Sequence, residues 1–149
     1  MRNRTMFIGL LLAAGLSGCS GGRSPVNLGV SAGRLAPCPD SPNCVSSQAD
    51  AVDQRVEPLR YAGEPAAAQT RLLETLNGME RAQLVQADEH YLHAEFRSAV
   101  LGFVDDVEFL FSLPGVIQVR SASRTGYYDF GVNRERVEAI RARVAPVAP

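Results

Sequence analysis

Four consecutive segments with the patterning of β-strands restrict the fold of this 149-residue chain more than any other feature. The expected strands cover residues 81–87, 91–98, 103–111 and 116–123. In the second of them, Leu92, Ala94 and Phe96 lie on one face, as in a strand that buries one side. Because the connections between these segments are short, neighbouring strands are expected to pair antiparallel. The sequence therefore predicts one domain built on an antiparallel four-stranded sheet.

A helix is expected on each side of these strands. Pro65 suits the first turn of a helix that ends at Asn77-Gly78, and Asn133 is expected to cap a second helix. The apolar residues at helical spacing are Leu72, Leu73, Leu76 and Met79 in the first helix and Val137, Ile140 and Val144 in the second. We therefore predict an α+β fold of order α-β-β-β-β-α, with both helices packed on one face of the sheet.

The N-terminal residues have the pattern of an export signal. Arg2 and Arg4 precede an apolar run over residues 6–16, which is too short to span a bilayer but suits a signal peptide. The sequence Leu-Ser-Gly-Cys at residues 16–19 resembles the lipobox of bacterial lipoproteins, in which the cysteine is acylated and becomes the new N-terminus. The alternative is an ordinary signal peptide with a chance cysteine near its cleavage site. We expect a lipoprotein anchored to the membrane through Cys19 and facing the periplasm.

The other boundaries follow from composition. Residues 1–18 are the expected signal peptide, and residues 19–35, rich in Gly and Ser, are an expected flexible tether. Residues 36–144 form the expected domain, and residues 145–149 are an expected frayed tail. Ser20 stands where inner-membrane lipoproteins carry Asp, so the resemblance favours the outer membrane of a Gram-negative bacterium.

The charge of the chain argues against nucleic acid as a partner. The whole chain has a formal net charge of −1. Removal of the signal peptide takes away Arg2 and Arg4, which leaves 13 of the 15 basic residues against 16 acidic ones, a net charge of −3. A nucleic-acid-binding domain would normally show a basic patch or stripe.

Cys38 and Cys44 flank a turn of Pro, Asp, Ser and Asn residues. In an exported protein such a pair favours a disulfide, with a reduced pair as the alternative. A metal site is the weakest reading, because the spacing is not that of a zinc motif and only His90 and His93 could add further nitrogen ligands.

Two motifs resemble those of a known family. The first is Cys38-Pro39 followed by residues 41–47, and the second comprises residues 103–109, 119–124 and 126–134 with Arg136. On these motifs the chain resembles the domain of unknown function 1499 (DUF 1499) family over nearly all of residues 35–143. Members of this family are widespread in bacteria and plastids and often carry a lipobox or a membrane segment. The resemblance implies no established activity.

The turn at residues 113–115 sets an expected register in which residues whose numbers sum to 228 face each other. Phe109 would then face Val119, and Phe111 would face Ile117, on the core side of the sheet. On the outer side, Glu108 would face Arg120 as a surface ion pair worth under about 1 kcal/mol.

The same register places Asp105 opposite Ser123 on the core side, where a carboxylate needs hydrogen-bond donors. Arg134 lies in the first turn of the last helix, where the helix dipole disfavours positive charge, so we expect it to be held by Asp105 or Asp129. The predicted polar cluster comprises Asp105, Ser121, Ser123, Arg124, Asp129, Asn133 and Arg134. It would either support the loop at residues 126–133 or form a small pocket for a polar or anionic ligand.

Recognisable catalytic patterns are absent from the sequence. It contains no Gly-x-Ser-x-Gly elbow, no phosphate-binding loop and no cofactor signature. His93 is expected on the outward face of its strand as a surface residue, and Tyr127 and Tyr128 are candidates for a partner-binding patch. The sequence favours a non-enzymatic binding or scaffold lipoprotein with a possible envelope protein partner. The alternative is a periplasmic hydrolase or ligand sensor that uses the predicted polar cluster.

Overall fold

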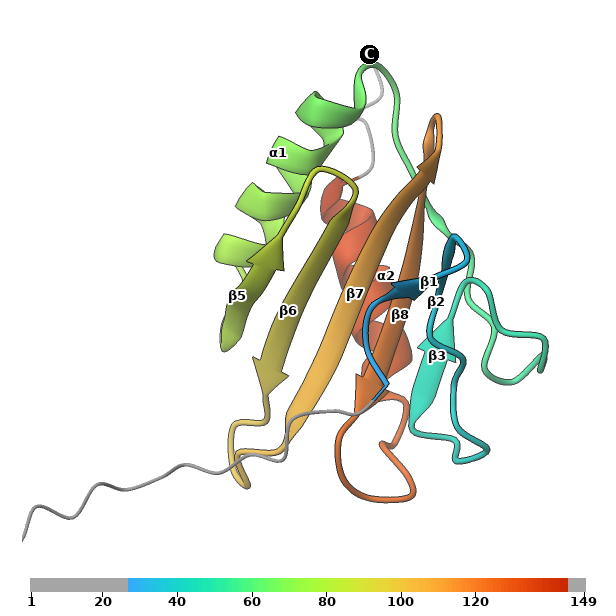
Figure 1. Cartoon of the computed structure of the whole chain (residues 1–149). Helices are drawn as coiled ribbons and strands as arrows, with labels where there is room; N and C mark the ends of the chain where they lie inside the picture. Colours follow the sequence, from blue (N-terminus) through green and yellow to red (C-terminus); the bar gives the residue numbers. More distant parts are fainter. Residues whose placement is uncertain (1–26, 145–149) are drawn as a thin grey trace, which may run out of the picture.

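The computed structural model describes residues 27–144, and within them the sheet is larger than predicted. The expected signal peptide, Cys19 and the expected frayed tail lie outside the described residues. The elements follow the order β1-β2-β3-β4-α1-β5-β6-β7-β8-α2, so the predicted order α-β-β-β-β-α is wrong although the class is α+β (Figure 1).

The predicted meander forms the main part of the sheet. Its antiparallel strands are β5 (Ala82–Ala87), β6 (Tyr91–Arg97), β7 (Val104–Leu113) and β8 (Val116–Ser123). The prediction of four strands is wrong, because β3 (Cys44–Ser46) and β4 (Leu59–Arg60) both pair antiparallel with the free edge of β8 and give a six-stranded sheet. These additions are two or three residues long, too short for alternating hydrophobicity to reveal them.

A separate two-stranded sheet lies over the outer face of the large one. It consists of β1 (Val30–Ser31) and β2 (Arg34–Leu35), and β2 contacts β7 and β8. In Figure 1 this blue hairpin lies in front of β7 and β8, whereas the helices lie behind them. The last residues of the segment expected to be a flexible tether are therefore packed against the domain.

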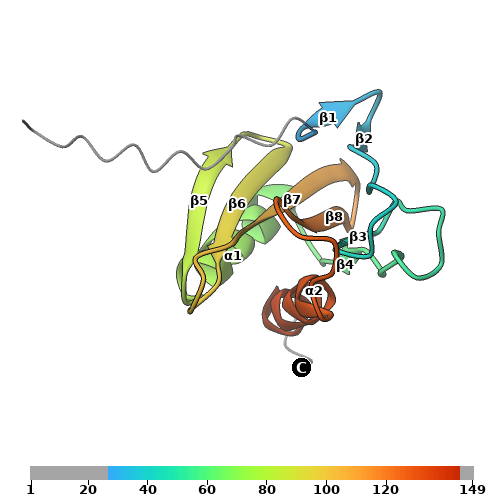
Figure 2. The same ribbon diagram turned by 90° about the horizontal axis from the view of Figure 1, so that it is seen from below.

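Both helices cover the inner face of the large sheet (Figure 2). They are α1 (Pro65–Asn77) and α2 (Val132–Val144), and within residues 27–144 neither is long and apolar enough to cross a membrane. The predicted inward residues pack into one core, although Leu73 and Met79 are only partly buried. Burial of this apolar face, rather than helix propensity alone, holds two helices of this length in place.

The register of β7 and β8 follows the predicted sum of 228 from Asp105–Ser123 to Leu110–Gln118. The predicted pairing of Phe111 with Ile117 is wrong, because the register shifts after Leu110 and Leu113 pairs with Val116. The shift places Phe111 and Ser112 together opposite Ile117, as in a β-bulge, where two residues of one strand face one residue of the other. Phe111 and Ile117 accordingly remain in the core.

Candidate functional site

The inner polar cluster is organised around the side chain of Asn133, which is completely buried. Its amide group contacts Ser121 Oγ at 2.6 Å, Arg136 at 2.7 Å, Asp129 at 2.9 Å, Ser123 Oγ at 3.0 Å and the Asn43 carbonyl at 3.1 Å. The two N–H groups of the amide are shared among three of these partners and the oxygen accepts from the other two, so the amide is fully used. Asn133 therefore links β8, the segment before β3 and the start of α2.

Asp129, rather than Asn133, caps the last helix. Its carboxylate accepts hydrogen bonds from the backbone N–H groups of Gly131 at 3.0 Å and Asn133 at 2.9 Å, and α2 already begins at Val132. Burial tends to raise the pKa of Asp129, but these hydrogen bonds outweigh it and hold the pKa below its usual range. The predicted cap at Asn133 is thus replaced by a carboxylate at the positive end of the helix dipole.

Arg136, and not Arg134, is the partner of Asp105. The Arg136 guanidinium donates to Asp105 at 2.6 Å and to Ser121 Oγ at 3.1 Å, and it lies 4.9 Å from the ring centroid of Phe96. Arg134 instead donates to two carbonyl groups, those of Asp53 at 2.6 Å and Arg55 at 2.8 Å. The expectation that Asp105 or Asp129 holds Arg134 is wrong, because residues one or two apart on a helix face different directions.

Arg124 lies on the other face of the sheet. It donates to both carboxylate oxygens of Asp106, at 2.7 and 2.8 Å, and also to Glu95. His93 Nε2 lies 2.7 Å from the same Asp106 carboxylate, and only 5% of His93 is exposed, so its expected position at the surface is wrong. Burial tends to raise the pKa of Asp106, but the hydrogen bonds from Arg124 and His93 outweigh it and lower the pKa.

A second network on the outer face joins Glu108 and Arg120 at 2.9 Å. Both residues are buried, with 0% and 1% exposed, so the expected surface ion pair is wrong. Glu108 also accepts hydrogen bonds from the Tyr91 hydroxyl at 2.8 Å and from the backbone N–H of Gly29 at 2.7 Å. Burial and the neighbouring Glu108 carboxylate raise the pKa of Tyr91 far above its usual value.

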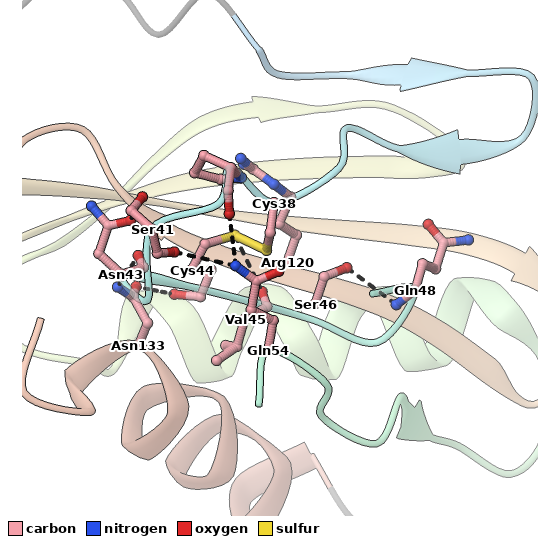
Figure 3. Close-up of a disulfide and its surroundings, with 12 residues drawn as sticks. Cys38, Ser41, Asn43, Cys44, Val45, Ser46, Gln48, Gln54, Arg120 and Asn133 are labelled. Carbon is pink, nitrogen blue, oxygen red and sulfur yellow. Dashed lines mark hydrogen bonds between the residues drawn. A yellow bond between two sulfur atoms is a disulfide. The ribbon is translucent and has the colours of Figure 1, made fainter. Parts of the chain in front are cut away.

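The β1–β2 hairpin and the segment that carries the disulfide help to cover the Glu108–Arg120 pair. Cys38 and Cys44 form the predicted disulfide, with a Cα–Cα distance of 5.7 Å. Figure 3 shows Arg120 beside these cysteines. Gln54 Nε2 donates to the carbonyls of Pro39 at 2.7 Å and Ser41 at 3.2 Å, so the turn between the cysteines is tied to the domain.

A cavity of about 760 Å³ opens beside the Asp105–Arg136 pair. It lies between the C-terminal end of α1, the end of β6 and one face of α2, and its walls include Met79, Arg81 and Arg143. The cluster therefore has one side that a small molecule could approach.

Exposed apolar side chains gather on two loops. In the β6–β7 loop, Val100 is 90%, Leu101 69% and Phe103 52% exposed. The β8–α2 loop adds a second exposed group, Tyr127, Tyr128, Phe130 and Val132. The two loops leave the same end of neighbouring strands, because the backbone N–H of Arg124 donates to the Val104 carbonyl at 3.0 Å.

The structure brings together five of the seven predicted cluster residues, namely Asp105, Ser121, Ser123, Asp129 and Asn133. Arg124 and Arg134 lie elsewhere, and Arg136 and Asn43 were not predicted. Helical spacing could have identified Arg136, since it is three residues after the buried Asn133 and four before the buried Ile140. Period-two alternation could likewise have placed Arg124 on the face of Arg120 rather than that of Ser123.

The chemistry of the cluster is mainly structural. Ser121 Oγ donates to the amide oxygen of Asn133, and His93 is on the opposite face of the sheet, so neither predicted serine has a histidine base beside it. Among residues 27–144, no group of three or more His, Cys, Asp and Glu residues could hold a metal ion. The polar atoms of the cluster chiefly satisfy one another.

Comparison with known proteins gives a family and no activity. No curated protein matches the chain. Residues 34–144 match the family described as protein of unknown function (DUF1499). This match spans the disulfide segment, the six-stranded sheet and both helices, which together make up most of the chain. The chain therefore belongs to the DUF1499 family.

Proposed function

We propose that this protein is a lipoprotein of the bacterial envelope. Its domain binds another envelope component or serves as a scaffold for one, and does not catalyse a reaction. It would be anchored through an acylated Cys19, in the outer membrane of a Gram-negative cell, with residues 36–144 facing the periplasm. The signal-like pattern before Cys19 and the oxidised Cys38–Cys44 pair support an exported protein.

The observation that carries the binding role is the contrast between the polar and apolar groups of the domain. The charged residues of both buried networks are paired with each other. Several large apolar or aromatic side chains are nevertheless exposed, with Tyr127 74% and Phe130 83% accessible. Exposed apolar residues gathered in one region are typical of a surface that contacts another molecule.

The anchor is tested by comparing wild type with Cys19→Ala and with the matched control Ser20→Ala. Wild type and Ser20→Ala should remain with the membrane fraction and show the mass of a lipid-modified N-terminus. Cys19→Ala should show neither property. An unmodified Cys19 in the mature wild type would overturn the anchor.

The binding role is tested by capture from detergent-solubilised envelopes followed by mass spectrometry. One envelope component should be recovered with wild type and lost when Tyr127 and Tyr128 are replaced by Ser. If the double variant recovers the same component in the same amount, the loop that carries Tyr127 and Tyr128 does not bind it.

The cavity beside Asp105 supports a second candidate, a sensor or hydrolase for a small polar or anionic molecule. Asp105 and Arg136 line it together, so it offers both an acceptor and a donor. Native mass spectrometry of the purified full chain should then show a co-purified small molecule. Ala139→Phe, which adds bulk at the cavity wall without touching the ion pair, should abolish that mass increment. A chain that retains the increment with Ala139→Phe does not use this cavity.

A further inference from the structure

Two loops at one end of the sheet carry exposed apolar residues and no exposed charged side chain. The exposed charged residues beside them, Arg81 and Arg97, lie at the strand ends and are paired with Glu80 and Glu95. The β6–β7 loop, residues 98–103, contains no charged residue. In the β8–α2 loop, residues 124–131, the charged side chains are Arg124 and Asp129, and both are engaged inside the domain. We call these two loops the apolar end; it is the lower end of the sheet in Figure 1.

The opposite end of the sheet differs in charge. The β5–β6 turn there carries Asp88, Glu89 and His90, and the side chain of Glu89 is 89% exposed. The β7–β8 turn at that end exposes Leu113, which is 59% accessible. An anionic turn is repelled by the acidic phospholipids of a bacterial membrane, whereas the apolar end is not.

The residues of the apolar end suit the boundary between lipid headgroups and acyl chains. Tyr127 and Tyr128 each combine an apolar ring with a hydroxyl group, and such side chains are enriched at this boundary. Leu101 and Phe130 add side chains without polar atoms, and Tyr128 and Phe130 pack edge to face with their ring centroids 5.2 Å apart. These loops combine groups that favour water with groups that favour hydrocarbon.

The position of the N-terminal segment allows this end to reach the membrane. The Gly29 backbone binds Glu108, which is four residues from the start of β7 at Val104 and thus about 13 Å from that end of the strand. Ten residues separate Cys19 from Gly29, and an extended chain of that length spans at most about 35 Å. A lipid on Cys19 and the apolar end can therefore occupy the same bilayer surface.

We propose that the apolar end rests in the headgroup region of the phospholipid membrane that holds the Cys19 lipid. This inference rests on the proposed anchor and goes beyond it by naming the lipid surface as the binding partner of Tyr127 and Tyr128. The domain then lies against the membrane in one orientation, with the acidic β5–β6 turn facing away.

The chain contains no tryptophan, so a single introduced tryptophan reports its own surroundings. Leu101→Trp places the probe at the apolar end, and Leu113→Trp is a matched control at a leucine of similar exposure at the opposite end. Tyr128→Trp is a second probe of the apolar end. Each mature, lipid-bearing variant is reconstituted into vesicles of phosphatidylethanolamine and phosphatidylglycerol, with and without brominated acyl chains that quench tryptophan.

Brominated lipid should remove about half or more of the emission of Leu101→Trp and Tyr128→Trp, since interfacial side chains reach the acyl boundary. The emission of Leu113→Trp should be unchanged. Lipid-bearing protein in which neither apolar-end probe is quenched, or in which Leu113→Trp is quenched more strongly, overturns the docking and leaves the anchor intact.

Two further outcomes also overturn the docking and are recognisable separately. Blue-shifted emission without quenching would mean that the loops are buried against protein, either a second copy or another chain. An intact mass without the lipid increment would remove the anchor, and the docking would fall with it.

Discussion

The buried Glu108–Arg120 pair leads to the most discriminating prediction about stability. Replacing Arg120 with Met keeps most of the side-chain volume but removes the charge. Among residues 27–144, Glu108 then retains only the Tyr91 hydroxyl and the Gly29 N–H as partners, in a site where the carboxylate is 0% exposed. A buried carboxylate that loses its counter-charge keeps its desolvation cost without the compensating attraction.

The expected loss in the free energy of unfolding is about 3–5 kcal/mol, the range for breaking a buried pair from one side. For a domain of this size that corresponds to a fall in Tm of roughly 10–20 °C. The double variant Glu108→Gln with Arg120→Met removes both charges and lets Gln accept the same two hydrogen bonds. It should be more stable than Arg120→Met alone, because no uncompensated carboxylate remains buried.

Wild type, Arg120→Met, Glu108→Gln and the double variant together form a double-mutant cycle. Urea unfolding followed by far-ultraviolet circular dichroism, with the disulfide intact, measures the free energy of unfolding of all four. The matched control is Arg97→Met, because the Arg97 partner of Glu95 is half exposed, and this change should alter stability by less than about 1 kcal/mol. A loss of under about 1 kcal/mol for Arg120→Met would refute the reasoning, because it would mean that water reaches the pair. Strictly additive losses in the cycle would show that the two charges do not interact.

Four further predictions concern the networks and the disulfide. Asn133→Ala should lower the free energy of unfolding in urea by about 2–3 kcal/mol, because buried partners lose their hydrogen bonds; a neutral effect would contradict the hub role. The pKa of Asp106 is lowered in the folded state, so its ionised carboxylate stabilises the fold at pH values above the unfolded pKa of about 3.9. This stabilisation is lost as the pH falls through the pKa of the folded state. Asp106→Asn should therefore lose less stability than wild type between about pH 5 and pH 2, and equal slopes would count against the network. The raised pKa of Tyr91 predicts the reverse: wild type loses stability above about pH 10, as the phenol ionises on unfolding, and Tyr91→Phe should lose less, measured by urea titrations at each pH. Replacing Cys38 and Cys44 together by Ala should cost about 2 kcal/mol, the chain-entropy value for so short a loop, and a cost near zero would show that the turn is held by its hydrogen bonds alone.

Much of the fold was predictable because it depends on local periodicity. Alternation over β5 to β8 predicted the meander, and the short turn at Pro114-Gly115 predicted the register of β7 with β8 through most of its length. The short strands β3 and β4 were not predictable, because their pairing depends on an open edge of β8 and not on their own residues. The bulge after Leu110 was not predicted either, because no Gly or Pro in the sequence marks its position.

The candidate site was predictable only on one face of the sheet. Alternation placed Asp105, Ser121 and Ser123 toward α2, where a buried carboxylate required a donor, and the structure supplies one from Arg136. Arg134 was predicted in place of Arg136 because the direction in which each side chain leaves the helix was assigned wrongly. Asn43 could not be found, because its backbone carbonyl reaches Asn133 across 90 residues of chain.

The sequence by itself determined the alternation of the strands, the inward stripes of the helices and the spacing of the cysteines, because each is a property of neighbouring residues. The tertiary structure decided which polar residues are buried. Glu108 and Arg120 occupy outward positions that period-two patterning assigns to solvent. They are desolvated because β2 packs on β7 and β8 and because Gly29 binds Glu108 from 79 residues away. Burial on that face is a property of the assembled domain, since it depends on segments that approach only after the sheet has formed.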